Sequence, residues 1–150
     1  MTGFKANVYS QKVIYQLDAG AYKPVKAHEA DAGFDLFSRE DVILSPNKTS
    51  RVDTGVHVLI PDGYVGLVLP CSSYNCAGMT TSTGVIDAGY TGSISVVLIS
   101  KYYLRIFAGN RIAQLVIVPL PGVNLVEGDV TGVKSERGLG SFRSSGKHKD

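Results

Sequence analysis

The chain has 150 residues, a formal net charge of +2, and 19% charged residues against a usual ~25%. This length is typical of one domain with a single core, and so small a charge predicts no broad attraction to nucleic acid. Two cysteines are too few for a disulfide scaffold, and the longest apolar run, Leu115–Leu120, is far shorter than the ~20 residues of a membrane-spanning helix. Met1–Ser10 has no apolar segment typical of a secretory signal. We expect a soluble intracellular protein, either cytoplasmic or nuclear.

Short runs of apolar and β-branched residues alternate with turn residues along most of the chain, and Val, Ile and Thr supply 35 of its residues. β-branched side chains pack well on pleated sheets. No window of a dozen residues has helical periodicity, although Ser72–Gly78 could form one helical turn. Short strands at this spacing predict an all-β sandwich or barrel. The expected strands are Val13–Leu17, Asp41–Leu44, Arg51–Ile60, Gly63–Leu69, Ser93–Ile99, Tyr103–Phe107 and Ile112–Val118.

The composition changes near residue 131, so we expect a single β domain over residues 1–130 and a C-terminal lid over residues 131–150. The last segment is rich in Gly, Ser and basic residues, and such a segment cannot bury itself in a core. It could be a frayed terminus or a lid that becomes ordered on a ligand. In the second case Arg137 could bind phosphate through its guanidinium, and Phe142 could stack on a flat ligand.

Three polar clusters lie in segments that the sequence predicts to be turns. The first, Asp31–Asp35, could hold Mg²⁺ through water with two carboxylates around a glycine turn, or could be a simple Asx turn. The second, Pro70–Ser73, offers hydroxyls to a phosphate oxygen or an N-cap to a helix. The third, Gly84–Tyr90, places Asp87 and Tyr90 at the tip of a hairpin, where a lone Asp is often structural.

The histidines and cysteines show no catalytic or metal-binding spacing. His28, His57 and His148 lie far apart in the sequence, and we expect ordinary surface or core histidines. Cys71 and Cys76 are too isolated for a zinc site, so we expect plain buried or half-buried thiols.

Taken in order, these segments and two others resemble the five motifs of the trimeric deoxyuridine triphosphate nucleotidohydrolases (dUTPases). The spacing of motifs two and three is similar to the shorter form in retroviral relatives. The motifs are Ala32–Ser38, Pro70–Gly78, Gly84–Gly92, Gly109–Leu115 and Arg137–Gly146.

The resemblance implies a distorted jelly roll that assembles as a homotrimer with active sites at subunit interfaces. Motif five then reaches the site from a neighbouring subunit as a lid. The implied reaction is hydrolysis of dUTP to dUMP and pyrophosphate with Mg²⁺, which would limit uracil incorporation into DNA and supply dUMP for dTTP synthesis. No direct binding to nucleic acid is expected.

The resemblance also implies a role for each matched residue. Asp87 matches the base that activates water, Ser72 the catalytic hydroxyl at the α/β phosphate bridge, and Asp35 the carboxylate that reaches the metal through water. Tyr90 would pack under the deoxyribose. The implied substrate-binding residues are Cys71, Ser73, Val85, Ile86, Tyr90, Ser95, Gln114, Arg137, Phe142, Ser144 and Ser145.

Three positions depart from the family pattern. Cys71 replaces an Arg of motif two, Asn110 replaces an acidic residue of motif four, and Arg143 replaces a Gly of motif five. A thiol cannot supply the charged fork of Arg, although Arg143 could restore the lost charge. Besides an active dUTPase, the chain could therefore be a weakened dUTP-binding or regulatory protein. A dCTP deaminase of the same fold is a third reading, which the absence of a Glu near Asp87 disfavours.

Overall fold

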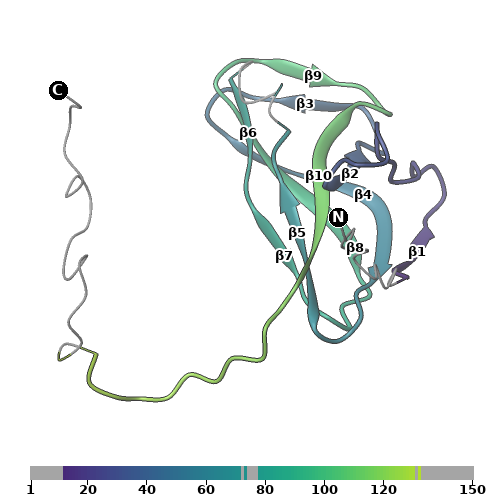
Figure 1. Cartoon of the computed structure of the whole chain (residues 1–150). Helices are drawn as coiled ribbons and strands as arrows, with labels where there is room; N and C mark the ends of the chain where they lie inside the picture. The colour runs from purple at the N-terminus through teal and green to yellow at the C-terminus, as the bar shows by residue number, and fades with distance from the viewer. Residues whose placement is uncertain (1–11, 72, 74–77, 131, 133–150) are drawn as a thin grey trace, which may run out of the picture.

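The structure is a computed structural model that describes residues 12–71, 73, 78–130 and 132. Every regular element named in this part of the chain is a β-strand, which confirms the all-β prediction (Figure 1). One antiparallel sheet has the order β1-β4-β8-β6, a second has the order β2-β10-β5-β7, and β3 pairs with β9. The strands are β1 (Ile14–Leu17), β2 (Gly33–Phe37), β3 (Val42–Leu44), β4 (Thr49–Leu59), β5 (Tyr64–Leu69), β6 (Met79–Thr81), β7 (Gly84–Ile86), β8 (Ser93–Ser100), β9 (Leu104–Ile106) and β10 (Arg111–Pro119).

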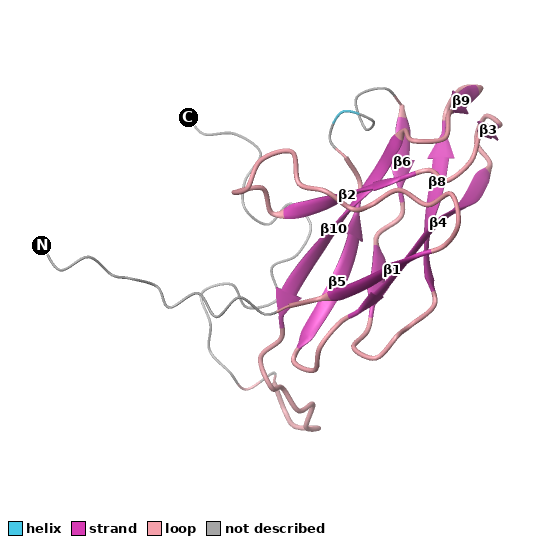
Figure 2. Ribbon diagram, turned by 90° about the vertical axis from the view of Figure 1, so that its right-hand side faces the viewer, coloured by secondary structure: helices cyan, strands magenta, loops and turns pink. Residues whose placement is uncertain are grey.

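The core lies between the two larger sheets, which face each other in Figure 2. Strand β8 shows the alternation that produces this arrangement, since Ile94, Val96 and Leu98 are fully buried while Ser93 and Ser95 are only partly buried. Successive side chains of a strand point to opposite faces of its sheet. The polar face of β8 is therefore available for a binding site while its apolar face fills the core.

Three short strands were not expected from the sequence. The prediction of a glycine turn at Asp31–Asp35 is wrong at its centre, because Gly33 begins strand β2. Strands β6 and β7 were also missed. Each has only three residues, which is too short a run to show the alternation of apolar and polar side chains that indicates a strand.

Strand β4 contains a bulge that shapes the outer face of its sheet. Asp53 pairs with Ser95 and His57 pairs with Ser93, so four steps along β4 match two along β8. Gly55 lies in the bulge with φ 66°, a conformation that favours glycine. The bulge brings Asp53 and His57 to the same partly buried face as Ser93 and Ser95.

The chain leaves the sandwich after β10. Residues 120–130 contain no strand, and Figure 1 shows them running away from the two sheets. The side chain of Leu125 is 99% exposed and that of Val126 is 86% exposed. Within the part of the chain that the structure describes, no helix is long and apolar enough to cross a membrane.

The packing of the bulge can be tested by substituting Gly55, with Gly63 in the turn before β5 as the control. Gly55→Ala and Gly63→Ala both place alanine at positive φ, at a cost of about 1 kcal/mol each. A Cβ at Gly55 would also stand 2.8 Å from the Ala21 Cβ and 3.0 Å from the Arg39 Cδ, whereas a Cβ at Gly63 meets nothing within 4 Å. Overpacking of this kind costs about 1–3 kcal/mol. Urea unfolding should therefore show a larger loss of stability for Gly55→Ala, and equal losses would contradict the tight packing of the bulge.

Candidate active site

Three segments that are distant in the sequence meet across the middle of the second sheet. Strand β10 pairs with β2 on one side and β5 on the other, so that Gln114 lies opposite both Asp35 and Leu69. A Cβ on Gly33 would stand 2.5 Å from the Gln114 Oε1 and 3.2 Å from the Gln114 Cβ, so a larger residue at position 33 would displace the Gln114 side chain. The Gln114 Nε2 donates a hydrogen bond of 3.1 Å to the Pro70 carbonyl, at the beginning of the Pro70–Ser73 cluster.

Arg111 connects the same segments through its guanidinium. Its Nη1 lies 3.3 Å from the Asp35 Oδ2, and its Nη2 lies 3.5 Å from the Ser73 Oγ. The Asp35 side chain is 19% exposed and is thus accessible from outside. The cluster therefore combines a carboxylate, a cation, a hydroxyl and an amide, the groups that suit a phosphate and its metal ion.

Cys71 lies beside this cluster as a buried thiol, as expected for an isolated cysteine; Cys76 lies outside the described residues. The Cys71 residue is 5% exposed. Burial raises the pKa of its thiol, the positive charge of Arg111 opposes this rise, and the negative charge of Asp35 adds to it. The net rise keeps the thiol neutral at physiological pH, so it brings no charge to the cluster.

A second polar site lies at the β7 edge of the same sheet. A cavity of about 350 Å³ opens between this hairpin and the outer face of β8. Strand β7 pairs with β5 and is the last strand in the sheet order, which leaves its outer backbone edge facing away from β5. The cavity is lined by Arg51, Gly84, Val85, Ile86, Asp87, Tyr90, Ser93, Ile94 and Ser95.

The turn after β7 is held close to the backbone by Tyr90. Its hydroxyl donates a hydrogen bond of 3.3 Å to the Ser93 carbonyl, and a Cβ on Gly92 would stand 2.3 Å from the Tyr90 hydroxyl oxygen. Glycine at position 92 thus permits the ring to lie against the turn. Tyr90 and Asp87 then border one cavity.

The two polar sites are far apart within one chain. Along β5, Ile86 pairs with Gly66, whereas Gln114 pairs with Leu69, and Asp35 lies one strand beyond Gln114. With ~3.3 Å per residue along a strand and ~4.8 Å between strands, Asp35 and Ile86 are roughly 17 Å apart. Asp87 follows Ile86 in the direction away from Asp35, so one chain does not bring both carboxylates to one ligand.

Comparison with known proteins identifies the family. A model of the dUTPase family matches residues 21–146. The deoxyuridine 5'-triphosphate nucleotidohydrolase of Tropheryma whipplei (strain Twist) is 44% identical over 135 residues, which cover 86% of this chain and 92% of the relative. The chain belongs to the dUTPase family.

Solved structures agree with this assignment. A mutant dUTPase of Staphylococcus bacteriophage 80alpha with dUpNHpp is 34% identical at a TM-score of 0.84, covering 92% of this chain and 100% of the other. A mutant dUTPase from phage phi11 of S. aureus, described with a structural Mg(II) ion, is 28% identical at a TM-score of 0.73, covering 85% and 99%. The distorted jelly roll and the dUTPase family implied by the five motifs are confirmed.

The structure does not describe every residue that the family resemblance selects. Ser72 of motif two and Arg137, Phe142, Ser144 and Ser145 of motif five lie outside the described residues, as does Arg143. The motif-four residue Arg111 received no role from the sequence, although it lies in the matched segment. Its position could have been suspected only by placing motif four beside motif one, because Arg111 and Asp35 are 76 residues apart.

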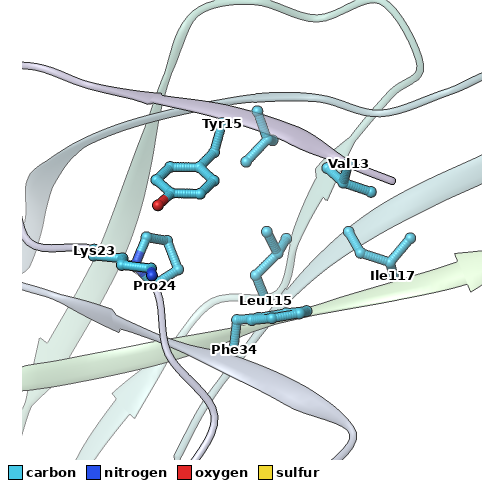
Figure 3. Close-up of a pocket in the computed structure, with 8 residues that line it drawn as sticks. Val13, Tyr15, Lys23, Pro24, Phe34, Leu115 and Ile117 are labelled. Carbon is cyan, nitrogen blue, oxygen red and sulfur yellow. The ribbon is translucent and has the colours of Figure 1, made fainter. Parts of the chain in front are cut away.

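A separate cavity of about 190 Å³ is not suited to a triphosphate. Figure 3 shows Tyr15 and Pro24 on one side of it and Phe34 and Leu115 on the other. Among the described residues that line it, Lys23 alone is charged. Burying several negative charges among apolar side chains would carry a large desolvation cost.

Asn110, which replaces an acidic residue of the family pattern, has a structural task before β10. Its Oδ1 accepts a hydrogen bond of 2.9 Å from the Phe107 N–H, and its own N–H donates to the Phe107 carbonyl at 2.9 Å. Gly109 adopts φ 83° in this turn. The oxygen of Asn110 thus serves the turn, while the neighbouring Arg111 pairs with Asp35.

Asn110→Asp should therefore preserve stability and kcat/KM, because a carboxylate oxygen accepts the same bond. Asn110→Ala should lose about 1 kcal/mol of unfolding free energy, since the exposed Phe107 N–H loses its protein acceptor. Thermal or urea unfolding of the two variants beside the wild type measures the difference. A loss of the same size in both variants would show that the side-chain NH2 group of Asn110 matters here, and not the oxygen that Asn and Asp share.

Proposed function

We propose that the chain hydrolyses dUTP to dUMP and pyrophosphate. The observation that carries this proposal is the presence of two complementary half-sites in a member of the dUTPase family. One is a hairpin cavity with a carboxylate and an aromatic ring, and the other is a phosphate-compatible cluster around Asp35 and Arg111. The similarity to a phage dUTPase solved with dUpNHpp supports the same assignment.

The hairpin cavity suits the nucleoside. The outer backbone edge of β7, around Val85 and Ile86, offers a fixed pattern of N–H and C=O groups, and Ser95 lines the opposite wall. Such a pattern would pair with uracil and reject cytosine, in which the donor at N3 and the acceptor at C4 are exchanged. The Tyr90 ring would support the deoxyribose and leave no room for a 2′-hydroxyl, and Phe142 of the lid would stack on the base.

Asp87 is the proposed general base. It would accept a proton from a water molecule whose oxygen attacks the α-phosphorus in line with the leaving group. The bond from the α-phosphorus to the bridging oxygen then breaks, and pyrophosphate leaves with the electron pair. The Ser72 hydroxyl is proposed to contact the α/β bridge, where charge develops in the transition state.

The phosphate side of the site would use the cluster on β2 and β10. Gln114 and Ser73 offer a donor and a hydroxyl, and Arg111 adds a positive charge next to the neutral Cys71. The Asp35 carboxylate is a hard oxygen ligand that fits Mg²⁺ through water. When bound, Mg²⁺ offsets the charge of the departing pyrophosphate. Arg137, Ser144 and Ser145 of the lid are proposed to hold the γ-phosphate.

The proposed assembly is a homotrimer with sites between subunits. The separation of roughly 17 Å between Asp35 and Ile86 prevents one chain from placing the base and the metal ligand on one triphosphate. A neighbouring chain would bring its own motif three to this cluster. Exposed apolar side chains beyond β10, such as Leu125 and Val126, provide surface that such an assembly could bury.

Substitution of the base gives the direct test of activity. Asp87→Asn should lower kcat by about 10²–10⁴-fold while dUTP still binds, because general-base catalysis contributes rate enhancements of this size. Pyrophosphate release from dUTP at millimolar Mg²⁺ is the measurement. The control Asp62→Asn, in the exposed turn before β5, should keep wild-type kcat.

The same assay separates the alternatives that the departures suggest. Binding of dUTP to the wild type without pyrophosphate release would indicate a non-catalytic protein, and ammonia release from dCTP would indicate a deaminase. With turnover of dUTP, a role in limiting uracil in DNA and supplying dUMP inside the cell follows from the products.

Subunit mixing tests the shared site. Asp35→Asn and Asp87→Asn should each be nearly inactive alone. After unfolding in urea and refolding together at equal concentrations, about a quarter of the sites should combine an intact Asp35 from one chain with an intact Asp87 from another. A mixture of Asp87→Asn with Asp87→Ala is the control and should stay inactive. Absence of recovery in the first mixture, with trimers formed, would place both groups in one chain.

A further inference from the structure

A closed series of contacts surrounds the turn that follows Tyr90. The Thr91 carbonyl lies 2.8 Å from the His57 Nδ1, and the His57 Nε2 lies 3.1 Å from the Asp18 Oδ1. Two residues further along the turn, the Ser93 hydroxyl donates a short hydrogen bond to the Asp53 carboxylate. The turn is thus held at both ends by side chains of the neighbouring β4 strand.

Arg39 closes the series behind the turn. Its Nη2 lies 2.8 Å from the Asp53 Oδ2 and its Nη1 lies 3.3 Å from the Asp18 Oδ2. The bulge at Gly55 makes this possible, because Arg39 passes close to the place where a Cβ would stand. We call the four side chains Asp18, Arg39, Asp53 and His57 the turn clamp. None of the four belongs to the five motifs.

His57 needs protons on both ring nitrogens to make both of its contacts. The Thr91 carbonyl only accepts, so the Nδ1 must donate, and the Asp18 carboxylate only accepts, so the Nε2 must donate as well. The bond to Thr91, followed by the bond to Asp18, raises the pKa of His57 above its ordinary value of 6.5. Loss of one proton leaves a nitrogen lone pair facing an acceptor.

The charges of Asp18 and Asp53 also raise the pKa of His57. Asp18 follows β1, Asp53 lies on β4, and Arg39 follows β2 between the two carboxylates. Burial raises the pKa of Asp53, but hydrogen bonds from Ser93 and Gly55 and the charges of Arg39 and Arg51 outweigh it and lower the pKa overall. Tyr15 lines the cavity of about 420 Å³ beside His57. The lowered pKa of Asp53 keeps this carboxylate ionised while His57 titrates.

The clamp acts directly on the proposed nucleoside cavity. Thr91 and Ser93 flank Gly92, against which the Tyr90 ring packs, and Ser93 also lines the cavity with Asp87. A shift of this segment would move the surface on which the deoxyribose rests.

We propose that His57 is a positioning residue, and that its doubly protonated imidazole, held by Asp18, fixes the Tyr90 turn in the conformation that accepts the deoxyribose. This inference rests on the proposed function for its substrate. The clamp itself is a property of the chain without ligand. Its contribution is complete below the ordinary pKa of a histidine and is lost as pH rises through the raised pKa of His57.

Solvent screening limits the effect of the clamp on dUTP binding, since the His57 side chain is 26% exposed and that of Asp18 is 39% exposed. Partly exposed ion pairs of this kind change an equilibrium by about two- to five-fold. The advantage in KM for dUTP that His57 gives the wild type should be of this size near pH 6 and should disappear at higher pH. The kcat should change much less, because the clamp touches no reacting atom.

The kinetic test compares variants at each pH, because the terminal phosphate of dUTP also titrates near neutrality and shifts every variant alike. The KM of His57→Ala divided by that of the wild type should be about two- to five-fold at pH 6 and near one at high pH. Asp18→Asn should give the same profile, and the double variant should add little to either. His28→Ala, which removes another exposed histidine, is the matched control and should give a ratio near one throughout. A ratio for His57→Ala that does not change with pH would overturn the proposal.

Hydrogen exchange without substrate separates this inference from the proposed function. The amides of residues 91–93 should exchange faster in His57→Ala than in the wild type at pH 6, after correction for intrinsic rates, with no difference at high pH. If exchange shows this dependence but dUTP is not hydrolysed, the proposed function fails and the clamp stands. If dUTP is hydrolysed while His57→Ala changes neither the exchange rates nor KM, the clamp fails and the proposed function stands.

Discussion

The position of strand β10 between β2 and β5 is the constraint on which the phosphate half of the candidate site depends. Its register places Gln114 opposite Asp35 and Leu69 at once. Ala113 and Leu115 of the same strand are buried in the core, so a shift by one residue would expose them and turn the polar Gln114 inward. Core packing on one face of β10 therefore fixes the chemistry on the other.

The same pairing separates the two halves of the site. Ile86 of strand β7 pairs with β5 three residues before the level at which Gln114 pairs, and on the opposite side from β10. The rigid spacing of a sheet leaves no small rearrangement that would bring Asp87 to Asp35. If the reaction needs both carboxylates, as proposed, it must use two chains, and the sheet order would then make the catalytic unit larger than the folded unit.

The sequence predicts the long strands and the motifs well, and the contacts between them poorly. Strands such as β4, β8 and β10 have enough β-branched residues to be recognised, whereas the local pattern predicts turns at Gly33 and Gly84 because glycine is rare in strands. The pair of Arg111 and Asp35 joins residues 76 positions apart. Such contacts depend on register and on the bulge at Gly55, which no local pattern encodes, and residues 133–150 lie outside the described part of the chain.

The replacement of a basic residue by Cys71 changes how the site must attract its substrate. The neutral thiol adds no charge, and the charge of Arg111 is partly offset by Asp35 at 3.3 Å. The cluster is therefore nearly neutral before ligand binds, and its Coulomb attraction for a triphosphate is weak. On the proposed function, attraction would then come from the cation that accompanies the nucleotide and from Arg137 and the unusual Arg143 of the proposed lid. Tight triphosphate binding in this chain would depend more on these two residues than it would with Arg at position 71.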